Sequence, residues 1–544
     1  MTATAGPREN AGSAPVPGPW WLLVPFALAF LVYLPALGGW FLSDDFVIKF
    51  MLDHSAPGVV VDWSEVLADF RRPWGGDEYS GAYRPLVTLA HSLSMWLGGS
   101  ALVFHASNVL QHALTSACCA YLCSLHCPLR PRTAAVLGGS FFALHPATVE
   151  PVAYISALTS TLETLFRVCC MVAFAIHLRS GGRRSFALSL GFAACALLSK
   201  ETAIPLPASL IVLDFLRGGR RSLPVLARRY LPFFGLWILY LLPRFLLFAS
   251  QVGGEGYSAS ELLVHYWNVA PGKLQLLFVP FLSVMDGATA LFAAPIVLCY
   301  ACVLLPFLST RTGVLTSCVA LAWILIHFLP TPLTRIGPGL AESRVVYGAV
   351  PSVALVLCYS LFNHYWRAGP LAKKLRHLQL VAILALVPSL CGFGMMCRTR
   401  LKDYDHAFNR IKQMRDDIVR YGRDATPVEP VAVLTHEEST GKVFMIGRSS
   451  SFHLSEIPFA SRDVPYLAMD FVMLEVHASR MLYRDPSPLR AMRELGARFL
   501  IHSPEDQRLV PDPVPFPVPA PVPVPAPVPL SRSPDLPATF NLSS

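Results

Sequence analysis

The first candidate for chemistry is a pair of adjacent acidic residues, Asp44 and Asp45, which follow an apolar run of membrane-spanning length. Ionised aspartates are costly to place in hydrocarbon, so at the end of an apolar helix they lie where water, a cavity or a substrate meets them. The alternative is that they only end the helix at the membrane interface. Adjacent residues on a helix point about 100° apart. We therefore expect one carboxylate, with Asp44 the first choice, to face a reaction centre while the other orients a phosphate-binding group or a metal.

Further polar and cationic residues are predicted at the outer ends of the helices and suit the same chemistry. They are Arg84, His105, His145, Glu150, Lys200, Glu201, Arg335, Glu342 and Arg344. A carboxylate can take the proton from an attacking hydroxyl while Arg and Lys hold a phosphate leaving group. Unrelated interfacial charges would fall on both membrane faces, so convergence on one face predicts a shared site that opens outward. No metal-ligand spacing is visible, so we predict no obligatory metal; a divalent cation stays open.

Structural interpretations stay open for several of these residues. His105 shares one helix face with Asn108 and His112, at spacings typical of a hydrogen-bonded seam between helices. His145 can be a satisfied histidine at a helix end, and Arg344 can snorkel its charge to the interface.

Two charge pairs have similarly plain interpretations. Lys200 and Glu201 can neutralise each other where a helix ends. Glu163 and Arg167 stand four residues apart inside an apolar run, and we predict that they pair with each other for structural reasons.

The composition is that of a polytopic membrane protein. The chain has 544 residues, 53% of them hydrophobic and 15% charged, which is too apolar for a soluble globular protein of this size. The net charge of +9 comes from short basic clusters between apolar runs. The positive-inside rule explains this pattern better than a nucleic-acid partner does. Most of the 13 cysteines lie in apolar runs and are interpreted as small buried hydrophobes.

Twelve apolar runs lie near residues 20–40, 86–98, 102–126, 134–149, 152–177, 186–198, 202–216, 231–249, 288–308, 313–329, 345–362 and 378–397. They predict about eleven membrane spans. Basic loops recur on one side, which places the N-terminus inside and the C-terminus outside. Residues 250–285 contain Pro271 and Pro280 and are predicted to form a surface or re-entrant helix.

The predicted domain organisation has four parts. Residues 1–19 are a disordered start, and residues 20–397 form the transmembrane domain. Residues 41–85 are its first outer loop, which carries the aspartate pair and an amphipathic surface helix from Trp63 to Phe70. Residues 398–510 form a small extracytoplasmic α/β domain, with a helix over Asp403–Tyr421 and strands over Val431–Leu434 and Lys442–Ile446. Residues 511–544 form a Pro-rich tail, extended where proline alternates with valine or alanine.

Six motifs, in this order, resemble the membrane part of the TMTC-type protein O-mannosyltransferases, which belong to the GT-C superfamily of polyprenyl-phosphate-sugar glycosyltransferases. They are Asp44-Asp45, Tyr83–Leu86, Phe104-His105 with Asn108 and His112, Leu144–Glu150, Leu198–Glu201, and Ala341–Arg344 with Tyr347. The resemblance covers roughly residues 20–420 and implies a GT-C fold, that is, an all-α polytopic membrane protein.

The resemblance also implies roles for particular residues. Asp44 or Asp45 would be the catalytic acid residue of the first outer loop. Arg84, Lys200 and Arg344 would contact the lipid phosphate of the donor. The sugar and acceptor pocket would be shaped by His105, His145, Glu150, Glu201 and Glu342. Attack at the anomeric carbon would proceed with inversion, which needs one base and no covalent sugar–enzyme intermediate.

The chain departs from the family pattern in two places. Where such proteins commonly have a Gly-Arg-Ala-Asp type stretch, this chain has Ser156–Glu163, so the sugar, with mannose as one candidate, does not follow. The tetratricopeptide repeats usual in the family are missing, which leaves the acceptor open between a protein, a glycan and a lipid.

The sequence thus predicts a membrane glycosyltransferase that uses a polyprenyl-phosphate-linked sugar and acts on the extracytoplasmic side, in a bacterial inner membrane. Its partners would be the bilayer, the lipid-linked donor and a protein or glycan acceptor. A transporter or flippase of lipid-linked sugars is the main alternative, but transporters usually have internal repeats and midplane charges, which are not visible here. A third possibility is an inactive scaffold for envelope assembly.

Overall fold

The computed structural model describes residues 19–53, 60–76, 82–218, 222–247, 258–283, 291, 293–308, 310–337, 340–364 and 376–423, and short stretches between 431 and 511. Almost all of the predicted start, 1–19, and tail, 511–544, lies outside the described residues. The chain divides into two compact units, Met1–Asp416 with Glu437–Asp463 and Asp417–His436 with Val464–Ser544.

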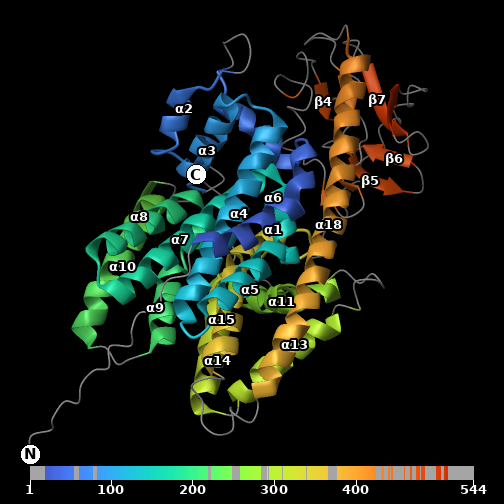
Figure 1. The fold of residues 1–544 in the computed structure, drawn as a ribbon. Coiled ribbons are helices and arrows are strands. Elements are labelled where there is room, and N and C mark those ends of the chain that lie inside the picture. Colours follow the sequence, from blue (N-terminus) through green and yellow to red (C-terminus); the bar gives the residue numbers. More distant parts are fainter. Residues whose placement is uncertain are drawn as a thin grey trace, which may run out of the picture. The chain divides into compact units, whose positions relative to one another are not determined.

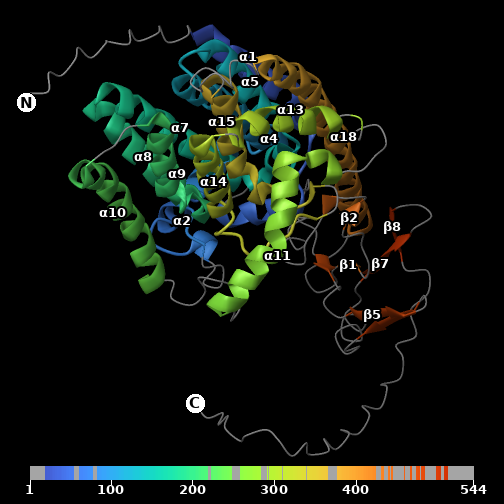
Figure 2. The ribbon, with the colours of Figure 1, turned by 90° about the horizontal axis from the view of Figure 1, so that it is seen from below.

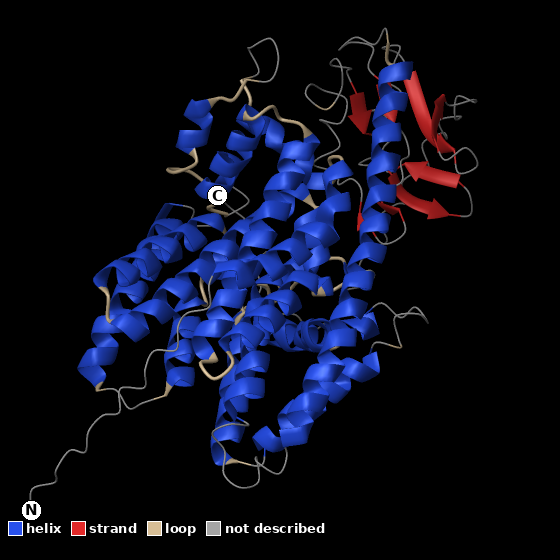
Figure 3. Cartoon of the chain, in the orientation of Figure 1, coloured by secondary structure: helices blue, strands red, loops and turns tan. Residues whose placement is uncertain are grey.

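The first unit is built mainly of helices, drawn blue in Figure 3 and labelled in Figure 1. They are α1 (Leu23–Tyr33), α2 (Trp63–Ala68), α3 (Pro85–Trp96), α4 (Ala101–His126), α5 (Pro131–Leu144), α6 (Val149–Ala153), α7 (Leu158–Ser180), α8 (Arg183–Ser199), α9 (Leu206–Arg217), α10 (Leu223–Leu247), α11 (Ala259–Phe278), α13 (Ala293–Leu308), α14 (Arg311–Ile326), α15 (Val350–Tyr359) and α18 (Arg376–Tyr421), whose last turn belongs to the second unit.

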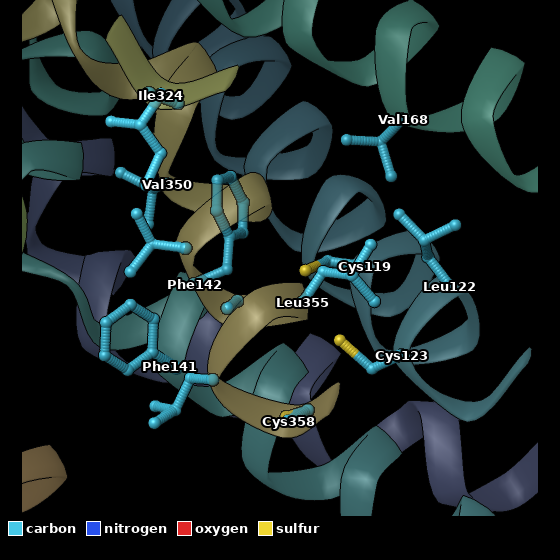
Figure 4. Close-up of a cluster of buried hydrophobic side chains, with 14 of the residues drawn as sticks. Cys119, Leu122, Cys123, Phe141, Phe142, Val168, Ile324, Val350, Leu355 and Cys358 are labelled. Carbon is cyan, nitrogen blue, oxygen red and sulfur yellow. The ribbon is translucent and has the colours of Figure 1, made fainter. Parts of the chain in front are cut away.

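The core of this unit forms around α4, which packs against α1, α5, α7 and α15. Figure 2 shows α15 and α7 beside α4. The close-up in Figure 4 shows Phe142, Leu355 and two cysteines of α4, Cys119 and Cys123, in this core. Cys119 and Cys123 are fully buried, as predicted for small hydrophobes. A Cβ at Gly138 of α5 would overlap the sulfur of Cys123, so glycine allows α5 and α4 to approach closely.

Five helices within the described residues are long and apolar enough to cross a membrane: Trp20–Gly38, Ile155–Ser180, Leu223–Leu242, Ser343–Asn363 and His377–Tyr421. On α10, Leu231, Ile238 and Leu239 leave 64%, 56% and 70% of their surface exposed, which suits contact with lipid. The chain is therefore that of a multi-pass membrane protein.

The predicted number of about eleven spans is not confirmed. Every predicted span contains a helix, but several of these helices are shorter than expected. For example, α9 has 12 residues, too few to cross about 30 Å of hydrocarbon at about 1.5 Å per residue. Hydropathy alone did not separate helices that cross the membrane from helices buried inside the bundle.

Other predicted elements are found with changed boundaries. The surface helix is α2, and the Asp62 carboxylate caps it by accepting hydrogen bonds from the amides of Ser64 and Glu65. The region 250–285 contains α11, with Pro271 inside it. The last predicted span and the helix expected over Asp403–Tyr421 are one helix, α18, because residues 398–402 contain no glycine or proline to end it.

The second unit contains a four-stranded sheet of order β4-β1-β7-β8. In it β1 (Val431–Val433) pairs in parallel with β4 (Tyr466–Ala468) and β7 (Arg498–Ser503), and β8 (Arg508–Pro511) runs antiparallel to β7. A separate antiparallel pair is formed by β5 (Met473–His477) and β6 (Arg480–Tyr483). Both predicted strands are present within the described residues, the first as β1. The second is β3 (Val443–Phe444), which pairs with β2 (Ser439–Thr440); these two strands belong to the first unit.

Candidate functional site

The aspartate pair lies in a 3-10 segment, Ser43–Met51, whose first residue, Ser43, has a positive φ (46°). Asp45 is fully buried, whereas Asp44 is exposed. The amide of Leu42 donates to Asp45 Oδ2 (2.8 Å), and Asp45 Oδ1 accepts from both the amide and the hydroxyl of Ser156 (2.7 Å each). Burial nevertheless raises the pKa of Asp45 to about 7. Asp45 therefore fixes the loop, and only Asp44 presents its carboxylate outward.

Tyr154 connects the exposed aspartate to a second group of site residues. The amide of Asp44 donates to the Tyr154 hydroxyl (3.0 Å), and the Arg344 guanidinium lies 5.6 Å from the centre of the Tyr154 ring. The charge of Arg344 also interacts with that of Asp44. An acidic side chain and a basic one thus meet at the same tyrosine, although 300 positions separate them in the sequence.

Arg344 is held by two glutamates. Its amide donates to Glu150 Oε2 (3.0 Å) and its Nη1 lies 3.7 Å from Glu150 Oε1, while its Nη2 donates to Glu342 Oε1 (3.0 Å). Burial raises the pKa of Glu150, an effect that Arg344 opposes. Glu342 has a positive φ (64°), and so does Leu340 (71°). Left-handed backbone at non-glycine residues costs about 1–3 kcal/mol and is concentrated at functional sites.

A third group joins the outer loop to the break between α8 and α9. Arg84 precedes α3, and its guanidinium binds both oxygens of Glu201 (Nη2–Oε1 2.5 Å, Nε–Oε2 3.1 Å). Arg84 also lies 5.2 Å from the centre of the Trp74 ring. Burial raises the pKa of Glu201, but pairing with Arg84 lowers it by more, so that the pKa falls to about 2. The two side chains keep 17% and 22% of their surface exposed, so the pair remains open to a ligand.

Lys200 lies between these groups. Its Nζ donates to the Ser160 hydroxyl (2.7 Å), and its charge interacts with those of Arg84, Glu201, Arg344 and Glu163. Burial and the neighbouring arginines lower the pKa of Lys200 to about 8. The predicted neutralisation of Lys200 by Glu201 is only partial, because Glu201 is bound through both oxygens to Arg84.

The structure therefore brings together seven of the ten predicted site residues. They are Asp44, Arg84, Glu150, Lys200, Glu201, Glu342 and Arg344. Most of them flank breaks between helices, where short 3-10 turns leave the backbone unable to continue a helix. Asp45 lies beneath the group, fully buried.

The two predicted histidines lie elsewhere. The Nε2 of His145 contacts the carbonyl oxygen of Leu277 (3.1 Å), and its Nδ1 accepts from the amide of Ala147 (3.2 Å). Its ring is fully buried, so His145 matches the structural interpretation, a satisfied histidine at a helix end. His105 is also fully buried; its Nε2 contacts the Trp40 carbonyl (3.2 Å) and its ring packs against Phe408. Neither histidine contacts the cluster of charges.

A small pocket beside the cluster includes residues that the sequence did not predict for the site. It is lined by Ser160, Glu163, Thr164, Arg167, Thr202, His327, Arg344, Val345, Gly348 and Ala349. The predicted structural pair is present: Arg167 Nε donates to Glu163 Oε1 (2.7 Å). Arg167 Nη2 also donates to the Thr202 carbonyl (2.6 Å), and Nη1 donates to that of Gly348 (3.1 Å).

Arg167 thus binds the two loops that carry Lys200 and Arg344. His327 contacts Arg167 Nη1 through its Nδ1 (2.7 Å) and was missed because one histidine in an apolar run gives no periodic signal. The sequence offered one signal for the network around Arg167: Glu163 and Arg167 stand four residues apart inside an apolar run. Groups of three or more His, Cys, Asp or Glu placed to hold a metal ion do not occur in the part of the chain that the structure describes.

Comparisons with known proteins give only distant structural likenesses. No protein-family model and no curated protein matches the chain. Similar solved structures include ArnT from Cupriavidus metallidurans bound to undecaprenyl phosphate, at 12% identity over 90% of this chain and 94% of that chain, with a TM-score of 0.44. The apo form of ArnT is 11% identical over 90% of this chain and 93% of that chain, with a TM-score of 0.43. The arabinofuranosyltransferase AftD from mycobacteria is 15% identical over 92% of this chain and 36% of that chain, with a TM-score of 0.46. TM-scores below 0.5 do not establish a common fold.

Proposed function

We propose that this protein is an integral-membrane glycosyltransferase of the GT-C type, which transfers a sugar from a polyprenyl-phosphate carrier to an acceptor on the extracytoplasmic side. The observation that carries the proposal is the exposed Asp44 carboxylate within electrostatic reach of Arg344, with Lys200 beside them. A base and an anion-binding cluster on one face are what transfer from a phosphate leaving group requires.

In the proposed reaction, Asp44 takes the proton from an acceptor hydroxyl. The hydroxyl oxygen attacks the anomeric carbon and forms the new glycosidic bond, while the bond from that carbon to the phosphate oxygen breaks. The polyprenyl phosphate leaves with the electron pair, and Lys200, Arg344 and Arg84 stabilise its negative charge. The reaction inverts the anomeric carbon and needs no covalent intermediate.

The remaining site residues have supporting roles in this proposal. Asp45 fixes the loop through Ser156, so that Asp44 stays at the surface of the cluster. Glu150 and Glu342 orient Arg344, and Glu201 orients Arg84. Mannose is one candidate for the sugar, and the acceptor is proposed to be a protein, a glycan or a lipid. The proposed location is a bacterial inner membrane.

The test is transfer of radiolabelled sugar from a panel of polyprenyl-phosphate donors by the purified protein. We expect release of polyprenyl phosphate by the wild type and its loss in Asp44→Asn. Asp405→Asn is the matched control, because Asp405 is an exposed aspartate of α18 outside the site. If no donor is consumed, yet labelled lipid crosses liposome membranes when the protein is present, the protein is a transporter instead. If neither occurs, the scaffold interpretation takes its place.

A further inference from the structure

Arg244, near the end of α10, carries a buried charge that the structure leaves almost without partners. The residue is 9% exposed. Among the described residues its one hydrogen bond runs from Nη1 to the Tyr240 hydroxyl (3.2 Å), and its Nε is buried with no partner. No carboxylate within the described ranges pairs with it. A buried, unpaired charge is strongly destabilising, so a native protein that keeps one calls for an explanation.

Arg244 lies next to the cluster of charges at the candidate site. The Tyr240 ring packs against that of Tyr83, with 6.2 Å between the ring centres, and Tyr83 immediately precedes Arg84. The Tyr240 hydroxyl also interacts electrostatically with Glu201, Arg84 and Arg244. The unpaired guanidinium therefore lies close to the Arg84–Glu201 pair.

The charge balance around the Arg84–Glu201 pair favours an anionic ligand. Arg84 and Glu201 neutralise each other through two hydrogen bonds. Of the cations near this pair, Lys200 is held by the Ser160 hydroxyl and Arg244 by the Tyr240 hydroxyl, and neither is bound to a carboxylate among the described residues. A phosphate oxyanion matches the donors of an arginine in geometry as well as in charge.

We propose that Arg244 is a further substrate-binding residue, whose unpaired guanidinium binds the phosphate of the polyprenyl-phosphate donor and of the released polyprenyl phosphate. This inference rests on the proposed function for the identity of the ligand. An anionic phospholipid of the bilayer offers the same chemistry, and the experiment separates the two sources.

The experiment measures binding of polyprenyl phosphate to the purified full-length protein, for the wild type, Arg244→Gln and Arg244→Lys. Arg228→Gln is the matched control, because Arg228 is an exposed arginine of the same helix. A hydrogen bond to a charged group contributes enough that Arg244→Gln is expected to weaken binding about tenfold to a hundredfold. Arg244→Lys should lose less, and Arg228→Gln should bind like the wild type.

A second measurement separates binding from a structural role. Loss of an unpaired buried charge should leave the thermal stability of ligand-free Arg244→Gln equal to or above that of the wild type. Polyprenyl phosphate should stabilise the wild type more than this variant. A variant that is less stable without ligand, yet binds polyprenyl phosphate normally, would overturn the proposal and make Arg244 structural. Tyr240→Phe should weaken binding less than Arg244→Gln; an equal loss would mean that Arg244 acts only through Tyr240.

The remaining outcomes of these binding measurements identify the ligand. If Arg244→Gln weakens binding of phosphatidylglycerol but leaves that of polyprenyl phosphate unchanged, Arg244 holds a bilayer lipid and the proposal is wrong. If the wild type consumes donor and Arg244→Gln binds polyprenyl phosphate normally, only this inference fails. If the wild type neither consumes donor nor binds polyprenyl phosphate, the proposed function fails and the inference fails with it.

Discussion

Ser156 donates both its amide and its hydroxyl hydrogen bond to the same oxygen of Asp45, at 2.7 Å each. Ser156 belongs to the stretch in which the sequence departs from the pattern of the family it resembles. The departure therefore does not leave the loop of the aspartate pair unsupported. A serine at this position holds the buried carboxylate, and the exposed one remains available.

Ser156→Ala should loosen the loop without removing the base. The variant keeps the amide contact to Asp45 and loses the hydroxyl contact. We expect a loss of about 1 kcal/mol in the free energy of unfolding, because one buried hydrogen bond is removed. Denaturant or thermal unfolding measures this loss. Ser185→Ala, in α8 and outside the site, is a suitable comparison. Equal stability of Ser156→Ala and the wild type would contradict the anchoring role.

Asp44→Asn should lower kcat for sugar transfer by about 10²- to 10⁴-fold, because the variant cannot accept the proton of the attacking hydroxyl. Its folding should be unchanged, because the Asp44 carboxylate is exposed and only its amide contacts Tyr154. Steady-state transfer kinetics beside a thermal melt check both statements. A stable, inactive Asp45→Asn together with a fully active Asp44→Asn would reverse the assignment of the base.

Asp45 should make the protein less stable as the pH rises. Its pKa in the folded protein is about 7, against 3.8 ordinarily, so the folded state holds the proton more tightly. The free energy of unfolding should thus fall as the pH rises from about 4 to about 7, by at most about 1.4 kcal/mol per unit, and then level off. Thermal melts across this range should show this component in the wild type and lose it in Asp45→Asn. An unchanged pH profile in the variant would exclude Asp45 as its source.

Lys200 should make donor binding fail in alkaline solution. Because its pKa is about 8, the amine loses its charge as the pH rises through that value, and KM for the donor should rise. Lys200→Arg should abolish this alkaline rise in KM, because arginine stays charged. The charge of Arg84 lowers the pKa of Lys200, so Arg84→Gln should move the rise in KM to higher pH. If KM still rises with pH in Lys200→Arg, a group other than Lys200 causes the rise.

Gly348→Ala should destabilise the protein by about 1–3 kcal/mol through overpacking. A Cβ at this position would lie 2.8 Å from Arg167 Nη1, and Arg167 is buried in its network. Gly191→Ala is the matched control, because a Cβ there meets nothing within 4 Å. That substitution should stabilise α8 by up to about 1 kcal/mol. Chemical denaturation of both variants measures the contrast, and equal shifts would show that the Gly348 contact relaxes freely.

The sequence by itself determined the class of protein and most of the charged site. Helices are local and follow from apolar runs, so every predicted span contains one. Cations and carboxylates at the ends of such runs are visible because charge in an apolar context is costly, and this is how Arg84, Lys200 and Arg344 were found. The pairing of Glu163 with Arg167 followed from spacing on one helix and is confirmed.

Only the tertiary structure decided what depends on long-range packing. Adjacent Asp44 and Asp45 have the same local signature, and a contact with Ser156, 111 positions away from Asp45, determines which is buried. The burial of His145 and the unpaired charge of Arg244 are likewise set by neighbours on other helices. The number of spans is not confirmed for the same reason. Hydropathy reports how apolar a helix is, whereas its length and neighbours decide whether it meets lipid or the interior of the bundle.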